Sequence, residues 1–244
     1  MLDIKIVGGQ VIDGTGTPAR RADVGITDDA VAAVSDLGRE PAGRTVDASG
    51  LTVTPGFIDM HSHSDWRLWA NPRAESKIRQ GVTTEVVGNC GFSPAPVSDE
   101  HRQDMRGFAL YLPPGMDFSW NGMGDYLRGY ETRGVALNVA QLIGHGTVRM
   151  AAMGFARRPP TARELATMER LVDESMAQGA VGLATGLIYA PGSYAATEEI
   201  VALARRPGAA AASTRATSGA RGRRCSTPWP RRSAWAGRAT CPSR

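Results

Sequence analysis

The stretch GFIDMHSHSD, residues 56–65, joins a short apolar run to an alternating pair of histidines and serines. In an extended segment, residues i and i+2 point to the same side, so His61 and His63 can direct two imidazoles at one point while Ser62 points away. The chain has four histidines, and two of them stand here. A paired His-x-His motif after what reads as a buried strand predicts a metal site.

Strands and helices alternate on the C-terminal side of this stretch. The patterns predict strands within 82–91, 135–146 and 181–189, and helices over 71–81, over 161–180 with Thr161 as N-cap, and from 197 to 204. Such alternation indicates parallel βα units. On the N-terminal side, residues 1–54 read as short strands separated by turns, which predicts a small all-β unit.

Chemically useful side chains follow four of the predicted strands: His61 with His63, Cys90, His145 and Tyr189. In a β/α barrel the carboxyl ends of the strands form the catalytic face, so these residues are expected at one edge. Two imidazoles and a thiolate suit Zn²⁺.

Each of these residues also has a purely structural interpretation. Cys90 could be a buried, inert thiol, and His145 could simply pack between Gly144 and Gly146. Asp65 could orient a metal ligand, contact substrate or cap a helix. His145 could bind substrate or stabilise charge. The sequence alone leaves these alternatives open.

Composition favours a globular protein that binds neither membrane nor nucleic acid. Hydrophobic residues make up 42% and charged residues 21%, no apolar run is long enough to span a bilayer, and three cysteines form no disulfide framework. We therefore expect a cytoplasmic protein. Ten arginines and no acidic residue fall in 205–244, which leaves a net charge of about −6 before position 205. The overall basic charge thus belongs to the tail.

The tail itself, residues 205–244, is expected to be disordered and out of frame. It is rich in Ala, Arg, Gly, Ser and Pro, and from residue 207 it lacks Ile, Leu, Val, Met, Phe and Tyr, so it cannot build a core. A neighbouring reading frame permits Tyr-Ala-Ser-His-Ile-Arg from Ser213 and an amphipathic helix pattern from Arg224. We expect a frameshift near residue 206, with a genuine basic tail as the alternative.

The motifs before the tail resemble those of a known family. The segments VGGQVIDGTG at 7–16 and DASGLTVTPGFIDMHSHSD at 47–65 resemble the amidohydrolase superfamily. The segments TEVVGNCGFSPAP, LIGHGTVR and QGAVGLATGLIYAPGSYAATEEI narrow the resemblance to the N-acyl-D-amino-acid deacylases, or D-aminoacylases. It covers residues 1–204.

The resemblance implies an α/β fold: a small all-β, β-sandwich domain over 1–54 and part of a TIM-type (β/α) barrel over 55–204. It implies one or two Zn²⁺ ions held by His61, His63 and Cys90, with Tyr189 at a substrate-binding position. It also implies hydrolysis of N-acyl-D-amino acids, small-molecule substrates, to a carboxylate and a D-amino acid.

The family's later histidines and catalytic aspartate have no counterpart in this sequence, so we expect the chain alone to be inactive or nearly so. Two alternatives remain open at this point. One is another amidohydrolase, such as a dihydroorotase- or hydantoinase-like cyclic amidase. The other is a non-catalytic pseudogene fragment, or a protein that binds metal or nucleic acid.

Overall fold

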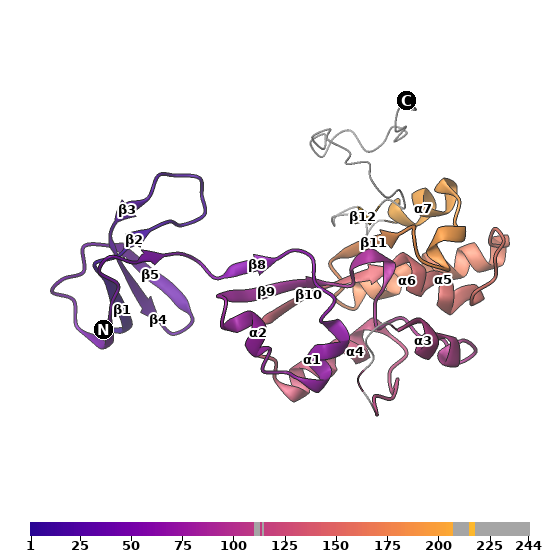
Figure 1. The fold of residues 1–244 in the computed structure, drawn as a ribbon, viewed down its shortest axis with the longest axis horizontal. Helices are drawn as coiled ribbons and strands as arrows, with labels where there is room; N and C mark the ends of the chain where they lie inside the picture. The colour runs from indigo at the N-terminus through magenta and orange to yellow at the C-terminus, as the bar shows by residue number, and fades with distance from the viewer. Residues whose placement is uncertain (110–112, 114, 207–214, 218–244) are drawn as a thin grey trace.

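The computed structural model describes residues 1–109, 113, 115–206 and 215–217, and Figure 1 shows two parts joined by a short stretch of chain. The first part holds two small sheets. A four-stranded sheet has the order β5-β4-β1-β6, and a three-stranded sheet has the order β3-β2-β7. Their strands are β1 (Leu2–Val7), β2 (Gln10–Val11), β3 (Arg20–Arg21), β4 (Asp23–Thr27), β5 (Ala30–Ser35), β6 (Ala42–Asp47) and β7 (Thr52–Val53).

The second part is built on one parallel sheet of five strands in the order β12-β11-β10-β9-β8. All four pairings are parallel. The strands are ordered across the sheet as they are along the chain, and because they are parallel their carboxyl ends lie at the same edge. The strands are β8 (Phe57–Asp59), β9 (Val82–Val87), β10 (Asn138–Gly144), β11 (Gly182–Gly186) and β12 (Arg215–Thr217).

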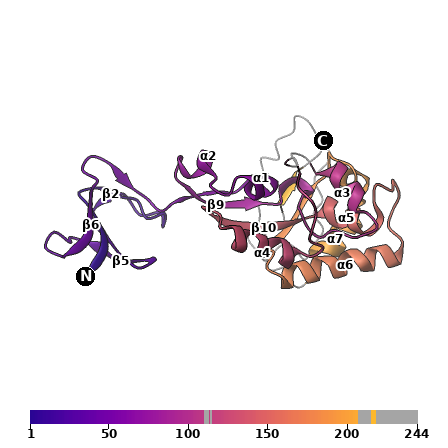
Figure 2. The same cartoon turned by 90° about the horizontal axis from the view of Figure 1, so that it is seen from below.

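Helices cover this sheet and close its core. The core includes Trp66, Met123, Ile143, Val148 and Met168, each at most 2% exposed. The longest helix, α6, runs lengthwise along the second part (Figure 2). The helices are α1 (Asp65–Ala70), α2 (Glu75–Ile78), α3 (Arg102–Phe108), α4 (Met123–Arg133), α5 (His145–Met153), α6 (Ala162–Ala177) and α7 (Thr197–Ala204), with short 3₁₀ turns at Asn89–Gly91 and Gly192–Tyr194. None of the described helices is long and apolar enough to cross a membrane.

Most of the predicted elements are present. Thr161 is the N-cap of α6, as predicted, and it forms a capping box with Glu164. The helix predicted over 71–81 shrinks to α2, because Ala74 adopts a left-handed conformation just before it. The sequence pattern did not predict α1, α3, α4 and α5.

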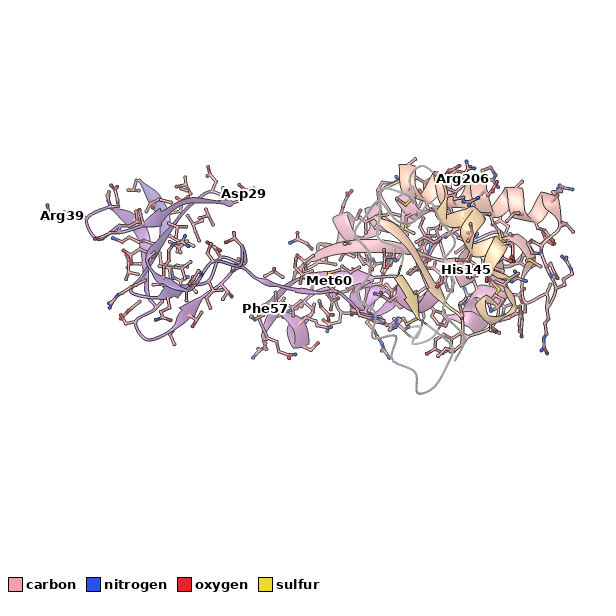
Figure 3. All side chains as sticks on the ribbon, turned by 90° about the horizontal axis from the view of Figure 1, so that it is seen from above. Asp29, Arg39, Phe57, Met60, His145 and Arg206 are labelled. Carbon is pink, nitrogen blue, oxygen red and sulfur yellow. The ribbon has the colours of Figure 1, made fainter. Side chains whose placement is uncertain are left out.

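The strand predicted directly before the two histidines is present as β8, but the prediction that it is buried is wrong. Phe57 is 57% exposed, Ile58 59% and Met60 51%, and β8 pairs with β9 alone in the described chain. Figure 3 shows Phe57 and Met60 on the stretch that joins the two parts. The apolar run reads as buried because nothing local distinguishes an end strand from a central one.

Five residues of the tail that the sequence predicts to be disordered are described by the structure. Arg205 caps α7, and Arg206 pairs with Asp173 and, at 3.8 Å, with Glu169. Arg215–Thr217 form β12, because strand pairing uses backbone groups that any residue supplies. The rest of the predicted tail lies outside the described residues.

Candidate metal centre

Three donor atoms converge beyond the ends of β8 and β9. The imidazoles of His61 and His63 and the thiol of Cys90 offer one ligand atom each, all within 4.8 Å of one another. Cys90 Sγ lies 3.3 Å from His61 Nε2, and the two imidazole centroids are 5.4 Å apart. Among the described residues, this is the one group of at least three His, Cys, Asp or Glu side chains placed to hold a metal ion.

The chemistry of this donor set fits zinc. Zn²⁺ takes imidazole nitrogen and thiolate sulfur, and three protein ligands with an open fourth position are typical of catalytic zinc. His63 is partly buried, and burial together with the neighbouring His61 holds its pKa below the usual value, so it is ready to donate a lone pair. The residues predicted from the sequence as ligands are therefore brought together.

The loop that carries Cys90 is forced close to two strand ends. Cys90 itself has a left-handed backbone, with φ of +56°, which a non-glycine residue rarely adopts. A Cβ atom on Gly186 would lie 1.8 Å from the Cys90 carbonyl oxygen, and one on Gly144 would lie 2.4 Å from that of Gly91. Glycine at the ends of β10 and β11 is thus what lets the Cys90 loop sit on the sheet.

Asp65 supports the Cys90 loop through a hydrogen bond to its backbone. It begins α1, is 1% exposed, and its Oδ2 accepts a hydrogen bond of 3.0 Å from the Gly88 amide. Burial raises its pKa to about 7, although the Gly88 bond acts in the opposite direction. Two tyrosine hydroxyls, of Tyr126 and Tyr130, donate to its carbonyl oxygen at 2.7 Å. Its carboxylate is not among the clustered donors, and a contact with substrate stays a prediction.

His145 lies at the start of α5, directly after β10, and is fully buried. Its Nε2 is 2.8 Å from Glu199 Oε1 on α7, and Glu199 also pairs with the buried Arg149. Burial alone would raise the pKa of Glu199, but the hydrogen bonds from His145 and Arg149 hold it below the ordinary value of 4.5. His145 is therefore part of a buried ionic cluster, and its predicted substrate role is untested.

Tyr189 lies three residues beyond β11 and is 39% exposed. Its ring meets Phe92 edge-on, with centroids 5.1 Å apart. Phe92 follows the Cys90 loop, so Tyr189 lies at the same edge of the sheet as the three clustered donors. Its predicted contact with substrate remains a prediction.

The sequence analysis did not predict the buried charged residues that support these side chains. Glu85 on β9 is fully buried and pairs with Lys77 of α2, and Glu199 and Arg149 form the cluster around His145. One signal was available for Lys77, since the chain contains only two lysines. The pairing partners are far apart in sequence, so their contacts could not be read from local patterns.

Comparison with known proteins identifies relatives. The profile of the amidohydrolase family matches residues 44–243. D-aminoacylase from Alcaligenes xylosoxydans xylosoxydans is 43% identical over 203 residues, which is 83% of this chain and 41% of that protein. N-acyl-D-glutamate deacylase from the same organism is 44% identical over 206 residues, 84% of this chain and 41% of that protein.

Solved structures agree with these matches. A D-aminoacylase with a binuclear metal centre superposes with a TM-score of 0.76 at 40% identity, over 84% of this chain and 43% of that one. N-acyl-D-glutamate deacylase from Bordetella bronchiseptica, complexed with zinc and a phosphonate mimic of the tetrahedral intermediate, gives 0.76 at 41% identity, over 84% and 42%. A dihydropyrimidinase from Brevibacillus agri, 18% identical with a TM-score of 0.50, over 88% and 40%, shares the fold. The chain spans about two-fifths of the length of these relatives, and it belongs to the amidohydrolase family.

Proposed function

We propose that this chain carries the metal-binding part of a zinc-dependent hydrolase that cleaves the amide bond of N-acyl-D-amino acids. The observation that carries the proposal is the convergence of His61, His63 and Cys90 in a chain more than 40% identical to two D-amino-acid deacylases. The products are a carboxylate and a free D-amino acid, and water is the second substrate.

The described residues divide the work between holding a metal and orienting a substrate. Bound zinc would lower the pKa of a water ligand and polarise the acyl carbonyl. His61, His63 and Cys90 hold the ion, and Asp65 keeps the Cys90 loop in place through Gly88. Tyr189, partly exposed at the same edge, offers a hydroxyl to a polar group of the substrate.

The finer architecture and location also belong to this proposal. The five parallel strands in chain order support part of a TIM-type barrel, and the two N-terminal sheets support a β-sandwich portion. Cysteine as a metal ligand needs a reduced thiol, which supports a cytoplasmic protein. We propose that the general acid/base comes from outside the described residues, because the donor cluster contains no carboxylate.

The test is ligand binding by the zinc-loaded chain. Phosphonate analogues of N-acetyl-D-methionine and its L-enantiomer, and a hydantoin, are titrated calorimetrically, with a chelated sample as control. The proposal predicts zinc-dependent preference for the D-phosphonate and very slow turnover of N-acetyl-D-methionine. Preferential binding of the hydantoin, or equal binding of the two enantiomers, would contradict the substrate class. Rapid deacylation would contradict the proposal that the general acid/base comes from outside the described residues.

A further inference from the structure

The segment that carries the two histidines has a second face, lined by serines. Ser62 and Ser64 alternate with His61 and His63, and the two serine oxygens are 2.9 Å apart. Ser62 Oγ lies 3.3 Å from Glu85 Oε1, and Ser64 Oγ also bonds to the Glu85 carboxylate. The face opposite the metal donors is therefore tied to β9 through one buried acid.

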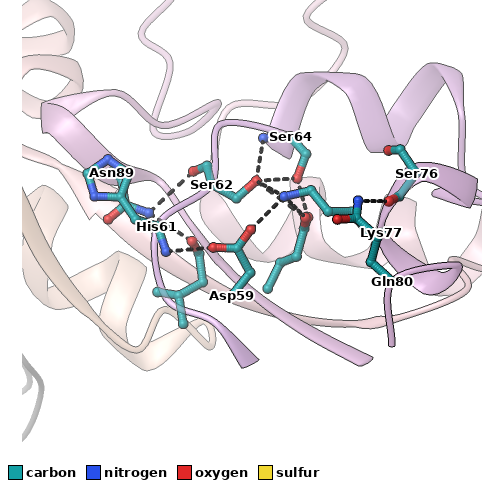
Figure 4. Close-up of polar contacts among 10 residues, drawn as sticks. Asp59, His61, Ser62, Ser64, Ser76, Lys77, Gln80 and Asn89 are labelled. Atoms are coloured by element: carbon teal, nitrogen blue, oxygen red, sulfur yellow. Dashed lines mark hydrogen bonds and ion pairs between the residues drawn. The ribbon is translucent and has the colours of Figure 1, made fainter. Parts of the chain in front are cut away.

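Lys77 joins that acid to the beginning of the same segment. Its Nζ is 2.9 Å from Glu85 Oε1 and 2.5 Å from Asp59 Oδ2. The other oxygen of Asp59 accepts a hydrogen bond of 3.1 Å from the His61 amide. Figure 4 shows this network, with Lys77 between Asp59 and the two serines. One cation thus links the groups that anchor the His-x-His segment at both ends.

We propose that Lys77 is a positioning residue of the metal centre, which holds His61 and His63 in their ligating arrangement through Asp59 and Glu85. The inference rests on the proposed zinc site and deepens it. Without Lys77, the fully buried Glu85 carboxylate loses its counter-charge and Asp59 loses its tether. The two imidazoles would then have to be ordered when the metal binds, which weakens binding without removing a ligand.

The experiment measures zinc affinity rather than activity. The purified chain is titrated with Zn²⁺ against a chromophoric chelator, as wild type, Lys77→Met, Lys77→Arg and Lys5→Met. Lys5, the only other lysine, is a matched control, because it is buried in the N-terminal sheets and donates to the carbonyl oxygens of Leu37, Gly38 and Glu40. Urea unfolding of each metal-free variant shows whether it is folded.

We expect Lys77→Met to bind zinc about 10- to 100-fold more weakly, the range typical when support behind a ligand is removed. Lys77→Arg should recover most of the affinity, and Lys5→Met should match wild type. Equal affinity of wild type and Lys77→Met, or an equal loss in Lys5→Met, would overturn the inference. Failure of wild type itself to bind zinc would instead overturn the metal centre and with it the proposed function.

A second variant covers the case in which Lys77→Met does not fold. In the double variant Lys77→Met/Glu85→Gln the buried charge is removed along with its partner, while the glutamine oxygen can still accept from the serines. Positioning through Asp59 predicts that this folded variant still binds zinc more weakly than wild type. Wild-type affinity in the double variant would overturn the inference.

Discussion

Replacing Glu199 with alanine should destabilise the second part of the molecule strongly. Glu199 is 4% exposed and is the counter-charge of the fully buried Arg149. Removing one partner of a buried ion pair costs about 3–5 kcal/mol, because the other charge is left uncompensated. Arg149 would keep its bonds to the carbonyl oxygens of Ala156 and Arg158, at 3.3 and 2.6 Å, which favours the lower end of that range.

The lost hydrogen bond to His145 adds about 1 kcal/mol, so we expect a decrease of about 4 kcal/mol in the free energy of unfolding. Urea denaturation followed by tryptophan fluorescence measures it, since Trp66 and Trp120 are buried in the same core. Glu198→Ala is the matched control, because Glu198 is the exposed neighbour on α7 and should change stability by at most about 0.5 kcal/mol.

The effect should also depend on pH. The native pKa of Glu199 is lowered from 4.5, so its contribution is present above the unfolded pKa and is lost as pH falls through the lower native value. The difference between Glu199→Ala and wild type should therefore shrink below about pH 4.5. Equal destabilisation by Glu199→Ala and Glu198→Ala at pH 7 would refute the ionic-cluster reasoning.

Three further changes test other parts of the account. Zinc at about 1,000 times its dissociation constant should raise the free energy of unfolding by about 4 kcal/mol, and Cys90→Ala should abolish most of that increase. Thermal unfolding with and without chelator measures the stabilisation by zinc. An undiminished stabilisation of Cys90→Ala would count against the thiol ligand. Gly186→Ala should displace the Cys90 loop, because the new Cβ would clash with the Cys90 carbonyl oxygen. We expect weaker zinc binding by calorimetry and a free energy of unfolding in urea that is lower by about 1–3 kcal/mol. No change in either measurement would show that the contact is not tight. An exposed apolar edge strand such as β8 favours aggregation, so Phe57→Lys should aggregate less than wild type on heating, as measured by light scattering. Equal aggregation of the two proteins would contradict a role for this edge.

The clustering of the three candidate metal donors could be predicted, because their geometry is local or follows from parallel pairing. The alternation of His61 and His63 places both imidazoles on one side, and Ser62 on the other, within one short segment. Cys90 joins them because β8 and β9 are parallel neighbours, so residues after their carboxyl ends must meet. The capping box at Thr161 is likewise a local signal.

The supporting residues could not be predicted, because their contacts join distant elements. Glu199 is 54 residues from His145, and nothing in either segment specifies the other. The exposure of Phe57 depends on which strand borders β8, and this is a property of the sheet rather than of the apolar run. The close approach of the Cys90 loop to the ends of β10 and β11 depends on the glycines there.

The most direct test of the central claim is X-ray absorption at the zinc edge of the metal-loaded chain. The account predicts one sulfur ligand at about 2.3 Å and two imidazole nitrogens at about 2.0–2.1 Å, with the sulfur contribution lost in Cys90→Ser. A zinc shell of nitrogen and oxygen alone, or a sulfur signal that persists in Cys90→Ser, would contradict a centre built from His61, His63 and Cys90.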